Sequence, residues 1–235
     1  MLQLGVDELK YTLKRSSRLF SNITIRIHAE RGVVVTAGRL VPVKIIEGFV
    51  KSKAGWIQEN LQKVNSKKIP PKSYSPAEKH LFWGIEYPLS FSLSLSPIRT
   101  QTELVGDSLV VKTHENHTPA EIKQALQRFY KENIIHYLTE KTNHYCSLFN
   151  VDYKKITIKE VSSIWGSCTR DNKLNFNTKL VLAPKEVVDY VVLHEVSHII
   201  QKNHSSRFWA LVARHDQYFR EHRRWLKKNQ HLLNF

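Results

Sequence analysis

The 235-residue chain has little of what marks secreted or membrane proteins. It contains only two cysteines, Cys146 and Cys168, far fewer than a small disulfide-stapled domain needs. No apolar run approaches the length that spans a bilayer. The first residues show no basic stretch followed by an apolar one, so we expect no secretory signal. These absences favour a reduced, cytoplasmic protein with no membrane partner.

Acidic residues are also scarce beside basic ones. The chain has 36 Lys and Arg against 21 Asp and Glu, a net charge of +15. Residues 1–70 hold 13 basic and 5 acidic side chains, residues 71–119 hold 4 and 5, and residues 120–235 hold 19 and 11. This excess favours acidic partners, but no nucleic-acid recognition motif accompanies it. We therefore expect weak binding to DNA or RNA, with a scattered, solubilising basic surface as the alternative; the oligomeric state is not predicted.

The first half of the chain is expected to be rich in strands. Alternation and turn residues predict a hairpin from residues 23–27 and 33–36, and further strands over 87–95 and 109–111. Helical spacing of apolar residues predicts one helix over 43–64. The three prolines within 66–76 indicate a loop.

The second half reads as mixed and richer in helix. Thr118 as a cap, Pro119 in the first turn and Glu121 at the third position predict a helix that runs to about residue 148. Strands are expected over 155–161 and 173–182, a helix from Pro184, and a last helical region over 206–233. The fold class is therefore α+β, with a β-rich N-terminal region over 1–117 and a second domain over 118–235.

The segment from His194 to His198 reads His-Glu-Val-Ser-His, an H-E-x-x-H motif. Positions four apart lie on nearly the same face of a helix, so the two imidazoles can bind one zinc ion. Glu195 then lies close enough to act as the general base on zinc-bound water. The motif stands among valines and isoleucines, where such polar groups are costly unless a partner such as a metal satisfies them.

A catalytic zinc needs a third protein ligand. His204 lies ten residues after His194, and in an unbroken helix it would be about 15 Å further along, out of reach. A helix end at Asn203, which tolerates the left-handed conformation, would allow His204 to turn back. A carboxylate from elsewhere, His215 or His222 are the alternatives.

The spacing from His198 to His204 equals that of the metzincin signature, but two features of that clan are missing. The expected glycine is Gln201, and a Met-turn is impossible because Met1 is the only methionine. The pattern therefore indicates a zincin-like core outside the metzincins.

The sequence resembles the YgjP-like zinc metallopeptidase family, and more distantly the SprT and Spartan-type proteases, which cleave proteins crosslinked to DNA. The residues that carry the likeness are Trp165-Gly166-Ser167-Cys168, Asn177, Leu180, Pro184, Asp189-Tyr190-Val191-Val192, the H-E-x-x-H, Asn203-His204-Ser205 and Phe208-Trp209, with a looser match before residue 115. The resemblance implies that His204 is the third ligand. The family's later Pro-Asp pair appears here as His215-Asp216.

These features predict a zinc-dependent metallopeptidase that hydrolyses peptide bonds of a protein substrate. Some family members carry a nucleotide pyrophosphatase label, so hydrolysis of a nucleoside triphosphate at the same metal is an alternative. That reaction needs cations near the zinc, and Lys202 and Arg207 flank His204. A nucleic-acid-associated protein with a non-catalytic zinc is a third hypothesis, which the carboxylate of Glu195 disfavours because a structural site needs no base.

Other residues have a functional and a structural interpretation. Trp165 and Asn177 are candidate substrate-binding residues; the structural alternatives are that Trp165 packs in the core and that Asn177 braces a loop. The strand at 175–177 is a candidate sheet edge for an extended peptide. Phe208 and Trp209 are expected to pack under the metal helix. The cations from Arg220 to Lys228 are typical of a solvated helix face, with phosphate binding as the alternative.

Overall fold

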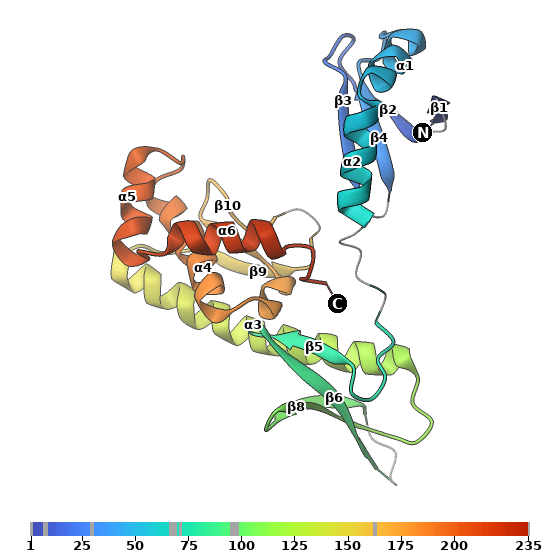
Figure 1. Ribbon diagram of the computed structural model, residues 1–235. Coiled ribbons are helices and arrows are strands. Elements are labelled where there is room, and N and C mark those ends of the chain that lie inside the picture. Colours follow the sequence, from blue (N-terminus) through green and yellow to red (C-terminus); the bar gives the residue numbers. More distant parts are fainter. Residues whose placement is uncertain are drawn as a thin grey trace. The chain divides into compact units, whose positions relative to one another are not determined.

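The computed structural model describes residues 2–6, 9–28, 31–65, 70, 72–94, 99–161 and 164–234. The chain divides into two compact units, residues 1–70 and 71–235. Within the described residues, no helix combines the length and apolar character needed to cross a bilayer. The α+β class is confirmed, because sheets and helices occur in both units (Figure 1).

The N-terminal unit is a four-stranded sheet with two helices. Its strands are β1 (Leu2–Val6), β2 (Leu9–Arg15), β3 (Thr24–His28) and β4 (Gly32–Ala37), in the order β1-β2-β4-β3. The expected hairpin is β3–β4, paired antiparallel, whereas β2 and β4 are parallel. The expected helix over 43–64 is two helices, α1 (Val43–Ser52) and α2 (Ala54–Asn65), because the chain departs from helical geometry at Lys53. Ile46, Val50 and Ile57 bury the inner face of this pair.

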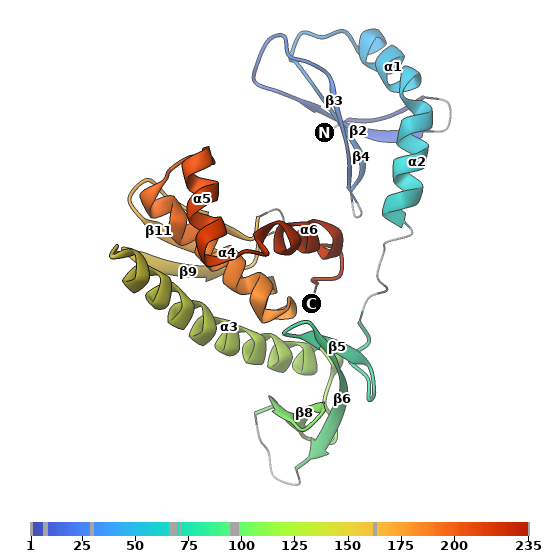
Figure 2. The same cartoon turned by 60° about the vertical axis from the view of Figure 1, so that its left-hand side comes forward.

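The C-terminal unit begins with a second four-stranded sheet. It contains β5 (Lys79–Phe82), β6 (Ile85–Leu93), β7 (Gln101–Val105) and β8 (Ser108–Thr113), in the order β5-β6-β8-β7. This sheet contacts α3 (Pro119–Phe149), the long helix that runs through the unit in both ribbon views (Figures 1 and 2). The Thr118 side chain caps α3, and the Glu121 carboxylate bonds back to the Thr118 amide, as the sequence predicted.

A three-stranded sheet and three helices complete the unit. The strands β9 (Lys155–Lys159), β10 (Gly166–Cys168) and β11 (Lys173–Asn177) lie in the order β10-β11-β9. The 3₁₀ helix η1 (Thr178–Leu182) leads into α4 (Lys185–Ile200), followed by α5 (Ser206–His215) and α6 (Phe219–Asn229). The expected strand over 173–182 is thus half strand, because Asn177 caps η1 through its side chain.

The division of the chain lies at residues 70/71, whereas the sequence suggested a boundary near residue 117. The reason is that the β5–β6 turn binds directly to the segment before the metal helix. The amides of Trp83 and Gly84 donate to the carbonyls of Val181 and Leu182 at 2.8 and 3.2 Å. Gly84 has φ +80°, and a Cβ there would lie 2.7 Å from the Pro184 ring. The sheet β5–β8 therefore belongs to the same compact unit as α4.

Candidate metal centre

Helix α4 carries the motif in a fully packed setting. Pro184 precedes it, and Val187, Val188, Val191, Val192 and Val196 are all buried in the main core. His194 and His198 lie one turn apart on the helix, with ring centroids 4.9 Å from each other. The helix therefore presents both imidazoles on one side, as the four-residue spacing predicted.

The chain leaves α4 by a different route from the one expected. The sequence suggested a left-handed residue at Asn203, but the helix ends where Gln201 becomes extended, with φ −124° and ψ 100°. Asn203 is not among the described residues with positive φ, and its side chain instead accepts a bond from the Ser205 amide at 3.3 Å. The extended Gln201 turns the chain as a left-handed residue would have done, because it directs the next segment away from the helix axis and back toward His198.

The three histidines converge on one point. The Nε2 atom of His204 lies 3.0 Å from Nε2 of His194 and 3.1 Å from Nε2 of His198. One ligand atom from each of the three residues falls within 4.8 Å of the others. Nitrogen atoms about 2.1 Å from a tetrahedral zinc are about 3.4 Å apart, close to the separations seen here. The donor set therefore fits a metal ion of this size.

The other ring nitrogens show how two of the imidazoles are held. Nδ1 of His198 donates to the Gln201 carbonyl at 3.0 Å, which leaves the Nε2 lone pair directed at the cluster. Nδ1 of His194 is buried and has no hydrogen-bond partner among the described atoms. Burial, with His198, His204 and Arg223 nearby, lowers the pKa of His194 to about 3. Burial also lowers the pKa of His198. Both rings are therefore neutral at physiological pH, as ligands must be.

Two other histidines considered as ligands lie outside the cluster. The His215 ring packs edge-on against Phe149, with centroids 5.0 Å apart. Nδ1 of His222 pairs with the Asp216 carboxylate at 2.8 Å. The histidine that the structure brings to His194 and His198 is thus His204.

Glu195 follows the first histidine and points into a closed space. Its side chain is only 6% exposed, and burial raises its pKa to about 8 in the metal-free chain. A Cβ at Gly166 would lie 2.7 Å from Cγ and Oε1 of Glu195. The backbone of β10 therefore passes directly over the carboxylate, and only glycine leaves room for that approach.

Asn177 and Trp165 are both used in building this region. Nδ2 of Asn177 donates to the carbonyls of Val161 and Ile164 at 2.8 and 2.9 Å, while Oδ1 accepts from the Lys179 amide. The side chain is 3% exposed, so these contacts favour the brace over the substrate-binding interpretation. Trp165 is half-buried and packs against the core, and its carbonyl accepts from the Asn177 amide.

The expected sheet edge at residues 175–177 is wrong, because β11 is the central strand and its neighbours β10 and β9 are the edges. Strand β11 is central, because it pairs with β9 in parallel and with β10 antiparallel. Strand β10 is at the edge of this sheet and has β11 as its partner among the described strands. The three residues of β10 were too short a segment to predict as a strand from their pattern.

Two aromatic side chains support the histidine cluster from α5. Phe208 is fully buried, with ring centroids 4.9, 4.5 and 4.9 Å from those of His194, His198 and His204. Trp209 stacks on His204 at 5.5 Å with an interplanar angle of 20°. Both residues pack against the histidines of α4, as expected, and they also contact His204 in the segment between α4 and α5.

Some groups at the site carry no signal in the sequence. The Gln201 carbonyl fixes His198, but main-chain groups leave no trace in residue identity. Asp189 accepts from the Tyr137 hydroxyl at 2.7 Å and pairs with Lys141 at 3.2 Å, which ties α4 to α3. Burial and that hydrogen bond raise the pKa of Tyr137 well above its usual range. Tyr137 and Lys141 lie more than forty residues before Asp189, so local patterns could not associate them.

Comparison with known proteins assigns the chain to a class. The model of the metallopeptidase domain of the YgjP-like family matches residues 21–229. The chain therefore belongs to the YgjP-like family, a metallopeptidase family whose membership implies a bound metal ion.

Among solved structures, the metallopeptidase zymogen abylysin of Pyrococcus abyssi is similar at 17% identity. The match covers 40% of this chain and 95% of that one, with a TM-score of 0.36. No curated protein matches the chain.

Proposed function

We propose that the chain is a zinc-dependent peptidase in which His194, His198 and His204 hold the ion. The observation that carries the proposal is the convergence of their Nε2 atoms. Those of His194 and His198 lie 3.0 and 3.1 Å from that of His204. Three imidazoles in a compact set are typical ligands of a catalytic zinc that keeps a fourth position open. Membership of a metallopeptidase family supports a peptide bond as the target.

A metal ion bound at these imidazoles would supply Lewis acidity, which makes a water molecule more acidic and a carbonyl carbon more electrophilic. Glu195 is proposed as the general base and then the general acid. Glu195 follows His194 on α4, and its carboxylate lies against Gly166 of β10. Burial raises its pKa toward neutrality, which is where a group can both accept and return a proton efficiently. A nearby cation would lower that pKa again and favour the carboxylate form.

The edge strand β10 is proposed to bind the substrate in extended form. An edge strand offers unpaired backbone groups to which a peptide can add as a further strand. Gly166 belongs to β10 and lies against Glu195, so a peptide on this edge would have a peptide bond close to the base. Asn177 supports this arrangement indirectly, by holding the carbonyls of Val161 and Ile164 just before β10.

The nucleotide alternative receives less support from the side chains near His204. Of the two cations that flank His204, Lys202 and Arg207, the Lys202 ammonium already donates to Asn172 Oδ1 at 2.7 Å. This contact directs Lys202 to the β10–β11 turn. Because the chain belongs to a metallopeptidase family, peptide hydrolysis is the function that we propose.

The direct test combines metal analysis with a substrate panel. Protein purified without added metal should contain about one zinc per chain, and the zinc-loaded protein should cleave an unfolded protein such as casein. Chelation should abolish cleavage and zinc should restore it. Absence of metal with no uptake of zinc would refute the ligand assignment. Release of pyrophosphate from a nucleoside triphosphate, with no peptide cleavage, would replace the peptidase by a pyrophosphatase.

A further inference from the structure

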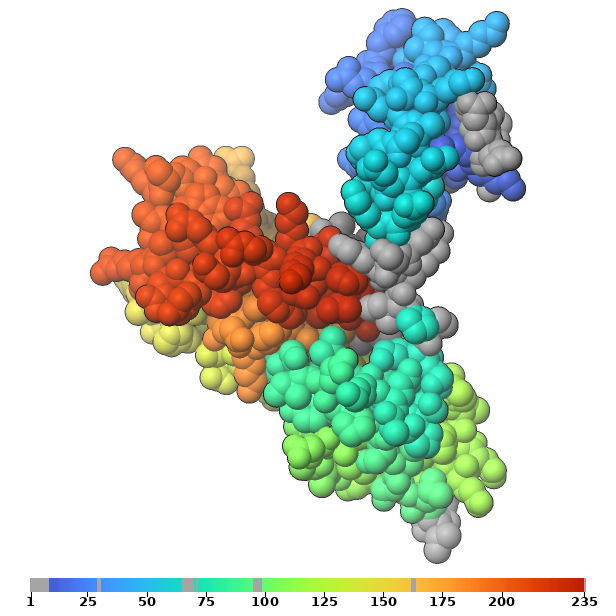
Figure 3. Space-filling view, viewed as in Figure 1, coloured from blue at the N-terminus to red at the C-terminus, as the bar shows by residue number. Residues whose placement is uncertain are grey.

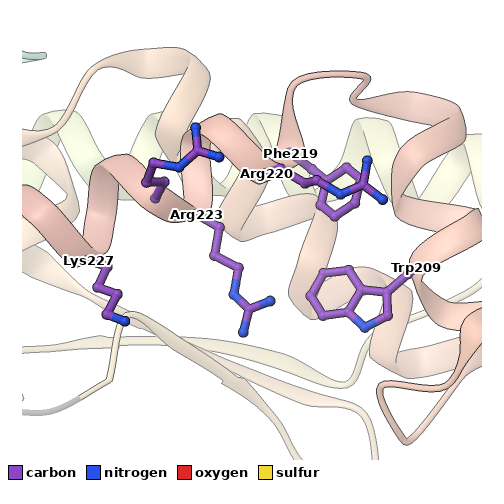
Figure 4. A pocket seen from close by; sticks show the side chains of 6 residues that line it. Trp209, Phe219, Arg220, Arg223 and Lys227 are labelled. Carbon is purple, nitrogen blue, oxygen red and sulfur yellow. The ribbon is translucent and has the colours of Figure 1, made fainter.

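A cationic hollow lies between α5 and α6, beside the histidine cluster. Residues of α6 reach the surface of the C-terminal unit, where they are coloured red in the space-filling view (Figure 3). The hollow has a volume of about 520 Å³ and is lined by Trp209, Phe219, Arg220, Arg223, Arg224 and Lys227. Figure 4 shows the Arg223 guanidinium between Lys227 and Trp209.

The cations of this hollow have no close acidic partner among the described residues. Four of its six lining residues are cations and none is acidic. Within the described part of the chain, none of the four forms an ion pair, whereas Lys141 pairs with Asp189 at 3.2 Å and Lys173 with Asp171 at 2.8 Å. Like charges gathered around one space repel each other, and an anion placed among them relieves that repulsion.

Aromatic rings hold two of these cations in place. The Arg223 guanidinium carbon lies 5.2 Å from the centroid of the Trp209 ring, and that of Arg220 lies 4.8 Å from the Phe219 ring. Trp209 and Phe219 are themselves stacked at 5.4 Å and 21°. Cation–π contacts of this kind restrict the guanidinium groups, so less entropy is lost when they bind a ligand.

The same contacts disfavour nucleic acid as the ligand. Proteins that bind single strands offer open aromatic faces on which bases stack. Here His204, Phe219 and the Arg223 guanidinium already lie against the Trp209 ring. The hollow therefore presents guanidinium and ammonium groups beside the Trp209 and Phe219 rings, an arrangement that suits a compact anionic group such as a carboxylate.

Trp209 is a wall common to the hollow and the histidine cluster. Its ring centroid is 5.5 Å from that of His204 and 5.8 Å from that of His194. The Trp209 ring therefore separates the hollow from the proposed metal ligands. An extended peptide advances about 3.3 Å per residue, so a side chain one or a few residues from the scissile bond can reach it.

We propose that this hollow is a substrate subsite that binds the carboxylate of an acidic side chain close to the scissile bond. The inference rests on the proposed peptidase function and names the substrate class that the site selects. Arg223 is the central residue, because it lines the hollow and lies over the ring that separates it from the cluster. The chain would then cleave acidic segments of proteins in preference to neutral ones.

The test measures selectivity on matched peptides with the zinc-loaded full chain. A peptide mixture analysed by mass spectrometry first locates the cleavage sites, and paired peptides then differ only by Glu or Gln at the position of acidic preference. We expect the Glu peptide to have about a tenfold higher kcat/KM, as for a partly exposed charged contact. This ratio should fall toward one as ionic strength rises.

Variants assign the preference to the hollow. Arg223→Gln should reduce the Glu-to-Gln ratio to about one, while Arg223→Lys, which keeps the charge, should retain part of it. Lys228→Gln is the matched control, since it removes the same charge from an exposed position of α6 outside the lining set. Arg224→Gln repeats the test independently if Arg223→Gln lowers the melting temperature or the zinc content.

Each contrary result has a distinct meaning. Equal cleavage of Glu and Gln peptides by the parent protein would overturn the subsite and leave the peptidase intact. Failure to cleave any peptide would overturn both proposals. If Arg223→Gln keeps the Glu-to-Gln ratio but loses binding of a single-stranded oligonucleotide, the hollow is a nucleic-acid site and the inference is wrong.

Discussion

Helices α4 and α6 of the C-terminal unit place their polar groups in opposite environments. Helix α4 buries most of its length, including Glu195, and burial shifts the pKa values of both His194 and Glu195. Helix α6 buries Phe219 and Leu226 and leaves its cations at the surface. Burial makes groups reactive, whereas exposure leaves charges available for recognition. Changes in α4 should therefore affect turnover and metal binding, and changes in α6 should affect substrate choice.

The largest effect is expected from Glu195→Gln, which preserves the shape of the side chain but removes its ability to accept a proton. Peptide hydrolysis should fall by roughly 100-fold to 10,000-fold, the usual contribution of a general base. Zinc content should stay at the parent level, because the carboxylate is proposed to act on water and not to bind the ion. Turnover that remains at the parent rate would show that another group is the base.

The next effect concerns the third ligand. His204→Ala should weaken zinc affinity by about 100-fold or more. Removing a group that only orients a ligand costs about 10-fold to 100-fold, and removing a ligand itself should cost more. His215→Ala is the matched control, because His215 contacts Phe149 and lies outside the cluster. Competition with a fluorescent zinc chelator measures both affinities. Equal affinity for the parent and His204→Ala, with a loss in His215→Ala, would reassign the ligand.

These two variants concern the part of the site that the sequence predicted well. The four-residue spacing of His194 and His198 depends on local helix geometry, so it survives in the structure. The position of His204 depends on how the chain reverses after α4, and the residues alone left other ligands open. Extended Gln201, and not left-handed Asn203, makes that reversal, which a propensity argument could not distinguish.

The parts that the sequence did not predict depend on distant contacts. Strand β11 is central because β9 and β10 pair with its two sides, and neither pairing is visible in its own alternation. The compact unit starts near residue 71 because the turn at Gly84 packs on Pro184, a hundred residues later. Periodicity identifies buried faces, but it does not identify the elements that cover them.

A smaller effect is expected from Gly166→Ala, which tests the approach of β10 to α4. The added methyl group would lie 2.7 Å from Glu195 Cγ and Oε1, so the carboxylate must move. We expect kcat/KM to fall by about tenfold, since a misplaced catalytic group loses orientation, with zinc content unchanged. Gly48→Ala is the control, because nothing lies within 4 Å of its added Cβ. Equal activity of Gly166→Ala and the parent would contradict the close approach.

The smallest effect concerns how the stability of the metal-free chain depends on pH, to which the buried Glu195 carboxyl contributes. Its folded pKa is about 8 against an ordinary 4.5, so the unfolded state releases the proton at lower pH than the folded state does. The stabilisation from the buried neutral carboxyl is therefore complete below pH 4.5 and is lost as pH rises toward 8, with a slope of at most about 1.4 kcal/mol per pH unit. His194, whose pKa is lowered to about 3, acts in the opposite sense, since its contribution is lost as pH falls from 6.5 toward 3.

Between pH 6.5 and 8 the difference between the parent and Glu195→Gln isolates the carboxyl group, because the histidines with lowered pKa values, His80, His194, His198 and His215, are present in both proteins. Urea unfolding of the chelated proteins should show the parent losing free energy of unfolding relative to Glu195→Gln as pH rises across that window, because Gln has no proton to lose. Lys228→Gln, at the exposed face of α6, should keep the parent slope. Parallel pH profiles for the parent and Glu195→Gln would mean that the Glu195 carboxyl is as well solvated in the folded chain as in the unfolded one. In that case α4 would not bury its carboxyl group, and its polar groups would not differ from those of α6 in this respect.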